Sequence, residues 1–415
     1  MIAGSGAGIS VTASTEPFFK LLRGGRVLAP RDLGEQDVLI AGKIIARIAP
    51  RIDPMPALGE VAVLDVQGKY VVPGFIDQHV HLIGGGGEGG FTTRSPELML
   101  GEIVIAGITT VVGCLGTDGT TRSVASLLAK ARALEEEGIT AYIYTGAYEV
   151  PPPTITGRVR DDLILIDKVL GCGEVAIGDH RSSQPSKEDI RKLAAESRVG
   201  GMLGGKAGVL HLHVGNGSGA LQMLLEIVGE TEIPISQFTP THLNRSMAVL
   251  NDGLRFAGAG GMIDITTSIH AKTDGREVVE PAEAVRHCLD KGVSLERITL
   301  SSDGNGSIPN FDARGRLQGL RVADIGSLHE TLRAVVAGGT PLPDALRLVT
   351  ENPAASLRLS PAKGCLAAGS DADVVVLDRD LAVERVFARG RLMVAEGKAI
   401  ARSTFEEPRR RDRRT

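Results

Sequence analysis

The chain has 415 residues, a formal net charge of −4, 42% hydrophobic residues and no tryptophan. This length predicts one large domain together with a smaller one, and the small negative charge gives no support for binding to nucleic acid or to an anionic membrane. The four cysteines are far apart and form no CxxC pair, which is typical of a reducing compartment. The N-terminal stretch lacks the pattern of a signal peptide. Together these features predict a soluble cytoplasmic protein.

Both ends of the chain are predicted to be rich in short β-strands. Residues 17–72 and 356–405 contain apolar runs broken by turn residues, and such separated segments predict one small β-sandwich domain built from both ends. Residues 1–16 are rich in Gly, Ser and Thr and predict a disordered tail. The last segment, 406–415, reads "EEPRRRDRRT" and predicts a solvated charged tail.

The middle of the chain, residues 73–355, alternates predicted strands with amphipathic helices. The strands are predicted at 74–81, 108–115, 140–148, 174–179, 209–215, 235–241, 262–269 and 297–303. The helices are predicted at 96–106, 121–137, 188–198, 218–229, 244–257 and 280–291. This α/β pattern predicts a (β/α)8 barrel, whose active site lies at the C-terminal strand ends. A doubly wound open sheet is the alternative, but no phosphate-binding glycine pattern opens the segment.

Metal-ligand residues recur at the predicted C-terminal ends of four barrel strands. The first strand ends "GFIDQHVHL", where His79 and His81 are two residues apart and therefore face the same way. Two neutral imidazoles placed close together suit a divalent transition metal such as zinc. Later strands end "LHLHVGN", "PTH" and "SSDGNG", and these supply His213, His242 and Asp303. Five such side chains at one end of a barrel predict a metal centre.

The remaining histidines are interpreted differently. His211 shares a strand face with His213 but lies one layer deeper, so it is interpreted as a packed core residue. His180 follows the fourth strand and is expected to orient a neighbour or cap a loop. Three further histidines are interpreted as structural or surface residues: His270, His287 and His329.

Several longer motifs carry a family resemblance. "VVPGFIDQHVHLIGGGGEGG", "TGAYEVP", "GDHRSS", "THLNRS" and "TLSSDGNGS" resemble the amidohydrolase superfamily and, within it, the isoaspartyl (β-aspartyl) dipeptidases. The similarity runs from about residue 18 to residue 405. The resemblance implies a zinc-dependent barrel with an attached β-sandwich, a homo-oligomeric assembly and isoaspartyl dipeptides as substrates.

The resemblance also implies roles for the metal-ligand residues. His79 and His81 would bind the more buried of two divalent ions together with Asp303, and His213 with His242 would bind the second ion. A carboxylate would bridge the ions, zinc being the expected metal, and a bridging hydroxide would be the nucleophile. Asp303 would accept its proton and pass it to the departing amine.

Further residues match the family's substrate pocket. Glu88 would take the α-ammonium group, and Tyr148 would help to polarise the scissile carbonyl. Two arginines would hold substrate carboxylate and two hydroxyl residues would complete the pocket: Arg181 and Arg245, then Thr117 and Ser307. These roles are physically reasonable, since an isoaspartyl dipeptide carries one ammonium group and two carboxylates, which planar guanidinium groups bind well.

The sequence departs from the family at the segment "GCGEVAIGDHR". Counting back seven residues from Arg181 places Glu174 where the family has a carbamylated lysine, at the predicted start of the fourth strand. Lys168 lies six residues earlier in a predicted helix and is rejected as the bridge. Glu174 shares its strand face with Ala176 and Gly178, which leave room for an inward carboxylate. An inward carboxylate needs a cation, so Glu174 is predicted to bridge the two metals.

Glutamate is shorter than carbamylated lysine, so the fourth strand must come closer to the metals, and the extra residue in "GCGEV" could allow this. The alternatives are a one-metal site that Glu174 merely lines, and a purely structural acid. The predicted function is metal-dependent hydrolysis of isoaspartyl dipeptides. An N-acyl-amino-acid deacylase or a cyclic amidase is the alternative enzyme, and a non-catalytic barrel homologue is the alternative outside enzymes.

Overall fold

The computed structural model describes residues 16–53, 59–217, 219–274, 277–311, 314 and 316–407. The tail predicted at 1–16 lies outside the described residues except for Glu16, and the tail predicted at 406–415 lies outside them except for its first two residues. Within the described part of the chain, no helix has both the length and the apolar character needed to cross a membrane.

Eight parallel strands form the curled inner wall of the larger part of the molecule. Six belong to one hydrogen-bonded sheet in the order β11-β10-β9-β8-β7-β6, and two form a separate pair. Their bounds are β6 Phe75–Val80, β7 Ile108–Gly113, β8 Thr140–Thr145, β9 Val169–Ile177, β10 Val209–Val214, β11 Phe238–Thr241, β12 Ile263–Thr266 and β13 Ile298–Ser301. All eight lie within the strands expected from the sequence, apart from the beginning of β9.

Contacts after the last strand close the wall into a barrel. The backbone N–H of Asp303 donates to the carbonyl of His79 (3.1 Å), and that of His81 donates to Gly304 (2.8 Å). On the other side of the strand pair, the Thr241 hydroxyl at the end of β11 donates to Asp264 of β12 (2.6 Å). The predicted barrel is therefore confirmed, and its closure brings the segment after β13 next to the end of β6.

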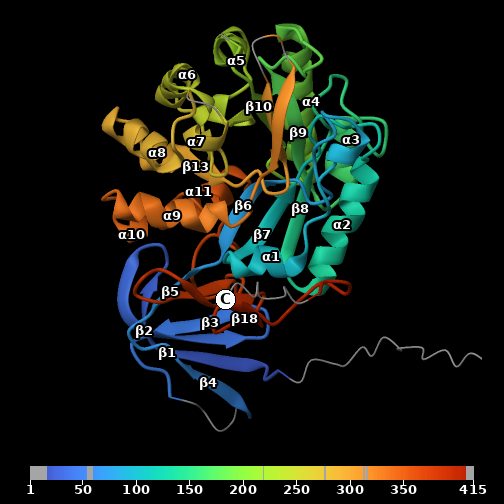
Figure 1. Ribbon diagram of the computed structural model, residues 1–415. Coiled ribbons are helices and arrows are strands. Elements are labelled where there is room, and N and C mark those ends of the chain that lie inside the picture. Colours follow the sequence, from blue (N-terminus) through green and yellow to red (C-terminus); the bar gives the residue numbers. More distant parts are fainter. Residues whose placement is uncertain are drawn as a thin grey trace, which may run out of the picture.

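Helices surround this barrel, as Figure 1 shows. The α-helices are α1 Leu100–Ile105, α2 Val124–Glu137, α3 Val159–Leu165, α4 Lys187–Gly204, α5 Ala220–Glu230, α6 Met247–Gly258, α7 Ala271–Asp274, α8 Pro281–Asp290, α9 Ser327–Ala337, α10 Leu342–Arg347 and α11 Glu351–Ser356. Short 3-10 turns are η2 Phe91–Thr93, η3 Ile235–Gln237, η4 Leu243–Arg245 and η5 Leu295–Arg297. An antiparallel hairpin that the alternating pattern did not predict, β14 Ser307–Phe311 with β15 Leu317–Val322, follows the last barrel strand.

Strands from both chain ends form a second, mixed sheet, which lies below the barrel in Figure 1. Its members are β1 Phe19–Leu28, β2 Asp32–Ala41, β3 Ile44–Ala49, β4 Val61–Asp65, β5 Tyr70–Pro73, β16 Val374–Leu377, β17 Val383–Ala388, β18 Arg391–Ala395 and β19 Lys398–Ala399. The antiparallel pairing of β5 with β16 joins the two ends of the chain. Because β6 begins two residues after β5, this sheet anchors the strand that carries the HxH motif.

The fourth barrel strand differs from its prediction. It begins at Val169 rather than 174, so Glu174 lies well inside the strand. Cys172 pairs with Leu210 and Val175 with Leu212, so Gly173 and Glu174 together oppose the single residue between these partners, which is a β-bulge. A Cβ at Gly173 would lie 2.7 Å from the Cβ of His211. Glycines usually weaken strand predictions, but here glycine lets two strands approach closely.

Candidate metal centre

The HxH motif places two buried imidazoles at the C-terminal end of β6. His79 Nδ1 lies 2.7 Å from His211 Nε2, and this contact directs the His79 Nε2 atom to the interior of the site. His81 Nε2 lies 3.0 Å from Asp303 Oδ1. The Nε2 atom of His79 is buried and has no hydrogen-bond partner among the described residues. An unpaired buried nitrogen is costly, so the Nε2 atom of His79 is available as a ligand.

Glu174 stands between two pairs of histidines. Its Oε1 atom lies 2.6 Å from His213 Nδ1 and 2.9 Å from His242 Nε2. Its Oε2 atom lies 3.4 Å from His79 Nε2 and 3.7 Å from His81 Nε2. Each carboxylate oxygen therefore faces a different histidine pair. Glu174 lies at the bulge in β9, so this irregularity falls at the residue that both histidine pairs face.

The second histidine pair is held by contacts behind the ligand atoms. Asp179 Oδ2 lies 2.9 Å from His213 Nε2, which leaves Nδ1 to face Glu174. Thr266 Oγ1 lies 2.6 Å from His242 Nδ1, which leaves Nε2 to face Glu174. Such outer contacts fix the tautomer and the ring orientation of metal-binding histidines.

Two residues that orient ligands were missed by the sequence analysis. The motif "GDHR" does not by itself indicate a ligand contact for Asp179, and the strand pattern predicts His211 as a packed core residue. His211 is indeed fully buried, but its Nε2 contacts His79 and its Nδ1 lies 3.1 Å from Thr239 Oγ1. A polar residue two positions from a ligand on the same strand face was the available signal.

His242 and Asp303 both adopt left-handed backbone conformations, with φ of 63° and 56°. His242 directly follows β11, and Asp303 lies two residues after the end of β13. Both are at the rim where the chain turns outward. Non-glycine residues in this region are uncommon and cluster at functional sites. The conformation turns both side chains back over the strand ends toward Glu174 and His81.

The donor atoms fit a pair of divalent cations. Two groups of buried ligands, one containing His79 and His81 and the other containing His213 and His242, share Glu174. The Oε2 atom of Glu174 has no hydrogen-bond partner among the described residues. Burial alone raises the pKa of Glu174, but the surrounding imidazoles lower it well below its usual value. An ionised carboxylate with an unsatisfied buried oxygen matches a binuclear metal site.

Asp303 is also held in its charged form. Burial raises the pKa of its carboxyl, but contacts with His79 and His81 outweigh burial and lower the pKa below its ordinary range. Its Oδ1 atom lies 3.4 Å from His79 Nε2 and 3.0 Å from His81 Nε2. Asp303 can therefore accept a proton, and it lies beside the first histidine pair.

Cys114 is a further donor in this region, and no motif in the sequence indicates it. It directly follows β7 and is fully buried. Its Sγ belongs to the ligand group of His79, His81 and Glu174. Burial raises the pKa of its thiol, but the two neighbouring imidazoles lower it below its ordinary value overall.

Lys168 does not approach the centre. Its Nζ lies 2.6 Å from Glu135 Oε2 and above the ring of Tyr142. It precedes β9 and is not part of the strand that reaches the ligands. The geometry therefore agrees with its rejection as a bridging residue.

Tyr148 lies over the second histidine pair. The third barrel strand is predicted to extend to residue 148, but β8 ends at Thr145, so Tyr148 is in the following loop. Its hydroxyl lies 2.7 Å from His213 Nδ1, and the Arg181 guanidinium carbon is 5.5 Å from its ring centroid. Burial is the main cause that raises its pKa well above the ordinary value, so the phenol remains protonated and able to donate.

The glycine-rich loop after β6 positions Glu88. Gly86 has φ of 79°, and a Cβ there would clash with the Thr93 carbonyl. The buried Arg122 guanidinium donates to the carbonyls of Ile83 (3.1 Å) and Gly85 (2.8 Å) and holds the loop. These contacts therefore fix the conformation of the loop that carries Glu88.

Glu88 accepts hydrogen bonds from three other residues of the predicted pocket. Its Oε1 atom accepts from Ser307 Oγ (2.8 Å), Thr117 Oγ1 (3.2 Å) and the guanidinium of Arg181 (3.3 Å). Its Oε2 atom is buried and has no partner among the described residues. One oxygen is thus fixed by the protein while the other can accept from a bound cation.

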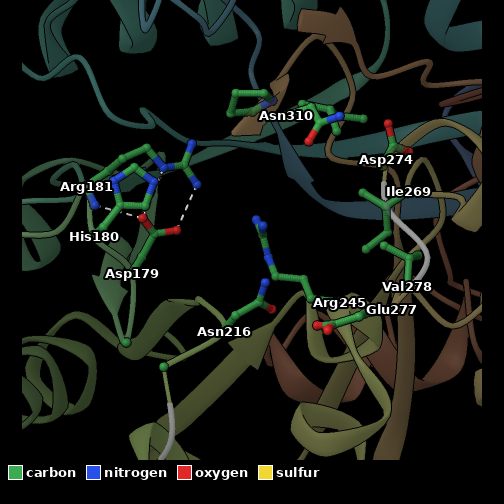
Figure 2. Close-up of a pocket in the computed structure, with 14 residues that line it drawn as sticks. Asp179, His180, Arg181, Asn216, Arg245, Ile269, Asp274, Glu277, Val278 and Asn310 are labelled. Atoms are coloured by element: carbon green, nitrogen blue, oxygen red, sulfur yellow. Dashed lines mark hydrogen bonds and ion pairs between the residues drawn. The ribbon is translucent and has the colours of Figure 1, made fainter. Parts of the chain in front are cut away.

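A cavity of about 580 Å³ opens beside the centre, between the ends of β9–β12 and the hairpin. Figure 2 shows Arg181 on one side and Arg245 extending into the space opposite. The guanidinium of Arg181 donates to both carboxylate oxygens of Asp179. His180 also lines this cavity. The Nε atom of Arg245 is buried without a partner, and no ion pair joins Arg245 to a carboxylate of the described residues. The cavity therefore presents a cation that can bind an anion.

A barrel that carries two histidine pairs at its C-terminal strand ends, with a carboxylate shared between them, is typical of metal-dependent amidohydrolases. The sequence pattern of the amidohydrolase family matches residues 70–393. The chain belongs to this family.

A more specific relationship comes from solved structures. The β-aspartyl dipeptidase of the thermophilic, keratin-degrading Fervidobacterium islandicum AW-1, solved in complex with the β-Asp-Leu dipeptide, is 41% identical to this chain. The comparison covers 92% of this chain and 98% of the other, with a TM-score of 0.85. The protein is therefore a β-aspartyl dipeptidase homologue, as the motifs predicted.

Other relatives resemble the chain in fold alone or over a short segment. A D-hydantoinase from Bacillus sp. AR9 has a TM-score of 0.67, covering 92% of this chain and 97% of the other, but only 17% identity. This comparison shows the fold alone. Dihydroorotase from Staphylococcus aureus (strain Mu50 / ATCC 700699) is 42% identical over 91 residues. That match spans 19% of this chain and only 21% of the dihydroorotase.

Proposed function

We propose that the protein hydrolyses the β-aspartyl amide bond of isoaspartyl dipeptides with two zinc ions bound at the Glu174 centre. The observation that carries this proposal is the arrangement of charge around the ligand cluster. Glu88 offers a carboxylate oxygen without a hydrogen-bond partner among the described residues. Arg245, which lines the cavity beside the centre, offers a guanidinium whose Nε atom is likewise without a partner. The similarity to the Fervidobacterium β-aspartyl dipeptidase supports the same substrate class.

The substrate chemistry matches these groups. The α-ammonium group of a β-aspartyl dipeptide would bind Glu88 Oε2, with Thr117 and Ser307 holding the opposite oxygen. A substrate carboxylate would pair with Arg245. Arg181 already forms a two-point contact with Asp179, so it supplies positive potential and a second, partly engaged donor.

The reaction proceeds through groups held at the strand ends. Two divalent ions bound by the two histidine pairs and Glu174 would supply a low-pKa water and polarise the amide carbonyl. Asp303 accepts the proton from the attacking water and delivers it to the departing amine. The Tyr148 hydroxyl donates a hydrogen bond to the developing oxyanion. His79, His81, His213 and His242 serve as ligands. The proposal also includes a homo-oligomeric assembly and a cytoplasmic location for the protein.

The test compares substrates and variants. We expect the zinc-loaded enzyme to cleave β-Asp-Leu and to leave N-acetyl-leucine and a cyclic amide such as dihydroorotate uncleaved. Glu88→Gln should reduce kcat/KM for β-Asp-Leu by about 10²-fold or more, since a charge-assisted contact to the ammonium group is lost. Glu97→Gln is the matched control, because Glu97 pairs only with Lys130 at the surface. Cleavage of the N-acyl or cyclic substrate, with β-Asp-Leu untouched, would overturn the proposal in favour of those activities.

A further inference from the structure

Cys114 lies beside the HxH motif and belongs to the same ligand group as His79, His81 and Glu174. Its backbone N–H donates to the carbonyl of Val80 (3.0 Å), the residue between the two histidines of the HxH motif. Its Sγ lies 3.9 Å from His81 Nε2. The β6–β7 pairing therefore fixes the thiol beside the first histidine pair.

The separations suit donors of one ion. Zinc binds sulfur at about 2.3 Å and nitrogen or oxygen at about 2.0–2.2 Å, so two of its ligand atoms can be at most about 4.5 Å apart. The sulfur-to-His81 distance of 3.9 Å is within this limit. So are the distances from Glu174 Oε2 to His79 Nε2 (3.4 Å) and to His81 Nε2 (3.7 Å).

Two buried atoms without hydrogen-bond partners also indicate a metal position beside Cys114. His79 Nε2 and Glu174 Oε2 are buried without hydrogen-bond partners among the described residues, and both belong with Cys114 to one ligand group. A buried cysteine usually serves as a small apolar side chain. Cys288 fits that description, because it is equally buried in α8 but belongs to neither ligand group.

We infer that Cys114 is a thiolate ligand of the ion bound by His79 and His81, so that the two metal positions differ in chemistry. This inference rests on the metal centre of the proposed function and adds one ligand to it. The first position would have a sulfur donor in addition to nitrogen and oxygen, whereas the second has nitrogen and oxygen alone. The thiol proton is released to solvent when the ion binds. Sulfur makes the first position favour thiophilic ions such as Zn²⁺ and Cd²⁺ over Mn²⁺.

Cobalt substitution tests this ligand directly. The metal-free protein is reloaded with Co²⁺, and the near-ultraviolet sulfur-to-cobalt charge-transfer band is measured together with cobalt content. We expect the band in the wild type and in Cys288→Ser, and its loss in Cys114→Ser and Cys114→Ala. The Cys114→Ser variant should also lower the ratio of Cd²⁺ to Mn²⁺ affinity by at least about tenfold. A cobalt-loaded wild type without the band, or a Cys114→Ser variant that keeps it, would overturn the inference.

A second measurement needs no variant and therefore does not depend on its folding. The ¹¹³Cd NMR spectrum of the cadmium-loaded wild type should contain one resonance shifted to the range of sulfur-containing sites and one in the range of nitrogen and oxygen sites. Two resonances of the second kind would refute thiolate ligation. Both readouts are separate from dipeptide turnover. A sulfur signal without cleavage of β-Asp-Leu would refute only the proposed substrate, and cleavage without a sulfur signal would refute only the ligand.

Discussion

At the scale of single residues, the centre depends on side chains whose charge states are linked. Glu174 and Asp303 are held ionised by the imidazoles around them. Burial lowers the pKa values of His79 and His81, but Cys114 and the nearby carboxylates outweigh burial and raise both values well above the ordinary one. These shifts favour the protonated form of both imidazoles in the metal-free protein. A cation must displace those protons before it can bind.

Metal affinity should consequently rise with pH. Because the raised pKa values of His79 and His81 keep the ligands protonated at low pH, lowering the pH should weaken binding by about tenfold per unit for each proton displaced. The measurement is a competition titration with a chelator of known pH dependence between pH 6 and pH 8. An affinity that is constant over this range would show that the histidines are already neutral before the metal binds.

The contact between Asp179 and His213 should be almost as important for metal binding as the His213 ligand itself. Asp179→Asn removes the charge that faces His213 Nε2, and we expect it to weaken the second metal by about 10–100-fold. Metal content after dialysis against a graded chelator series measures this effect. Asp167→Asn is the control, because Asp167 pairs only with Arg132 at the surface. Equal retention of both metals by the two variants would contradict an orienting role for Asp179.

At the scale of elements, the β-bulge in β9 lies at the residue that the two ligand groups share. Gly173 and Glu174 share a position opposite β10, and a one-residue insertion in a strand redirects the side chains near it. The hairpin β14–β15 plays a related part, since Ser307 at its start contacts Glu88. Local irregularities in a regular barrel therefore position the ligands and the pocket.

Adding a methyl group at the bulge should disturb both stability and metal binding. In Gly173→Ala the new Cβ would meet the Cβ of His211 at 2.7 Å, so we expect a loss of about 1–3 kcal/mol in unfolding free energy and lower metal content. Thermal unfolding and metal analysis measure these changes. Gly229→Ala in α5 is the matched control, because a Cβ there meets nothing within 4 Å. It should be neutral or stabilising. Identical behaviour of the two variants would show that β10 can move away from β9.

At the scale of the whole molecule, the metal centre joins strands that are distant in sequence. Its six predicted ligands come from the ends of β6, β10, β11 and β13 and from the interior of β9. A metal bound there connects both sides of the barrel, including the β12–β13 pair that is separate from the six-stranded sheet. The native state alone brings these ligands together, so metal binding stabilises the folded protein.

Removing the metal should therefore lower the apparent Tm without abolishing the fold. A ligand present at about 1,000 times its Kd contributes about 4 kcal/mol, and we expect chelation to produce a clear downward shift that Zn²⁺ reverses. Differential scanning calorimetry with and without chelator measures the shift, and far-ultraviolet circular dichroism checks that the metal-free protein keeps its helices. An unchanged Tm in a protein shown to lose both metals would contradict this coupling.

The sequence by itself determined the barrel, the HxH strand and the residues at four strand ends. These features follow from local periodicity, because side chains two apart share a strand face and parallel strands end on one edge. It also indicated Glu174, since an acid inside an apolar strand requires a cation. Only the tertiary structure decided that β9 begins earlier and contains a bulge. It also decided that His211, Asp179 and Cys114 contact the ligands, because such contacts depend on strand register and barrel closure, which no single segment of the chain encodes.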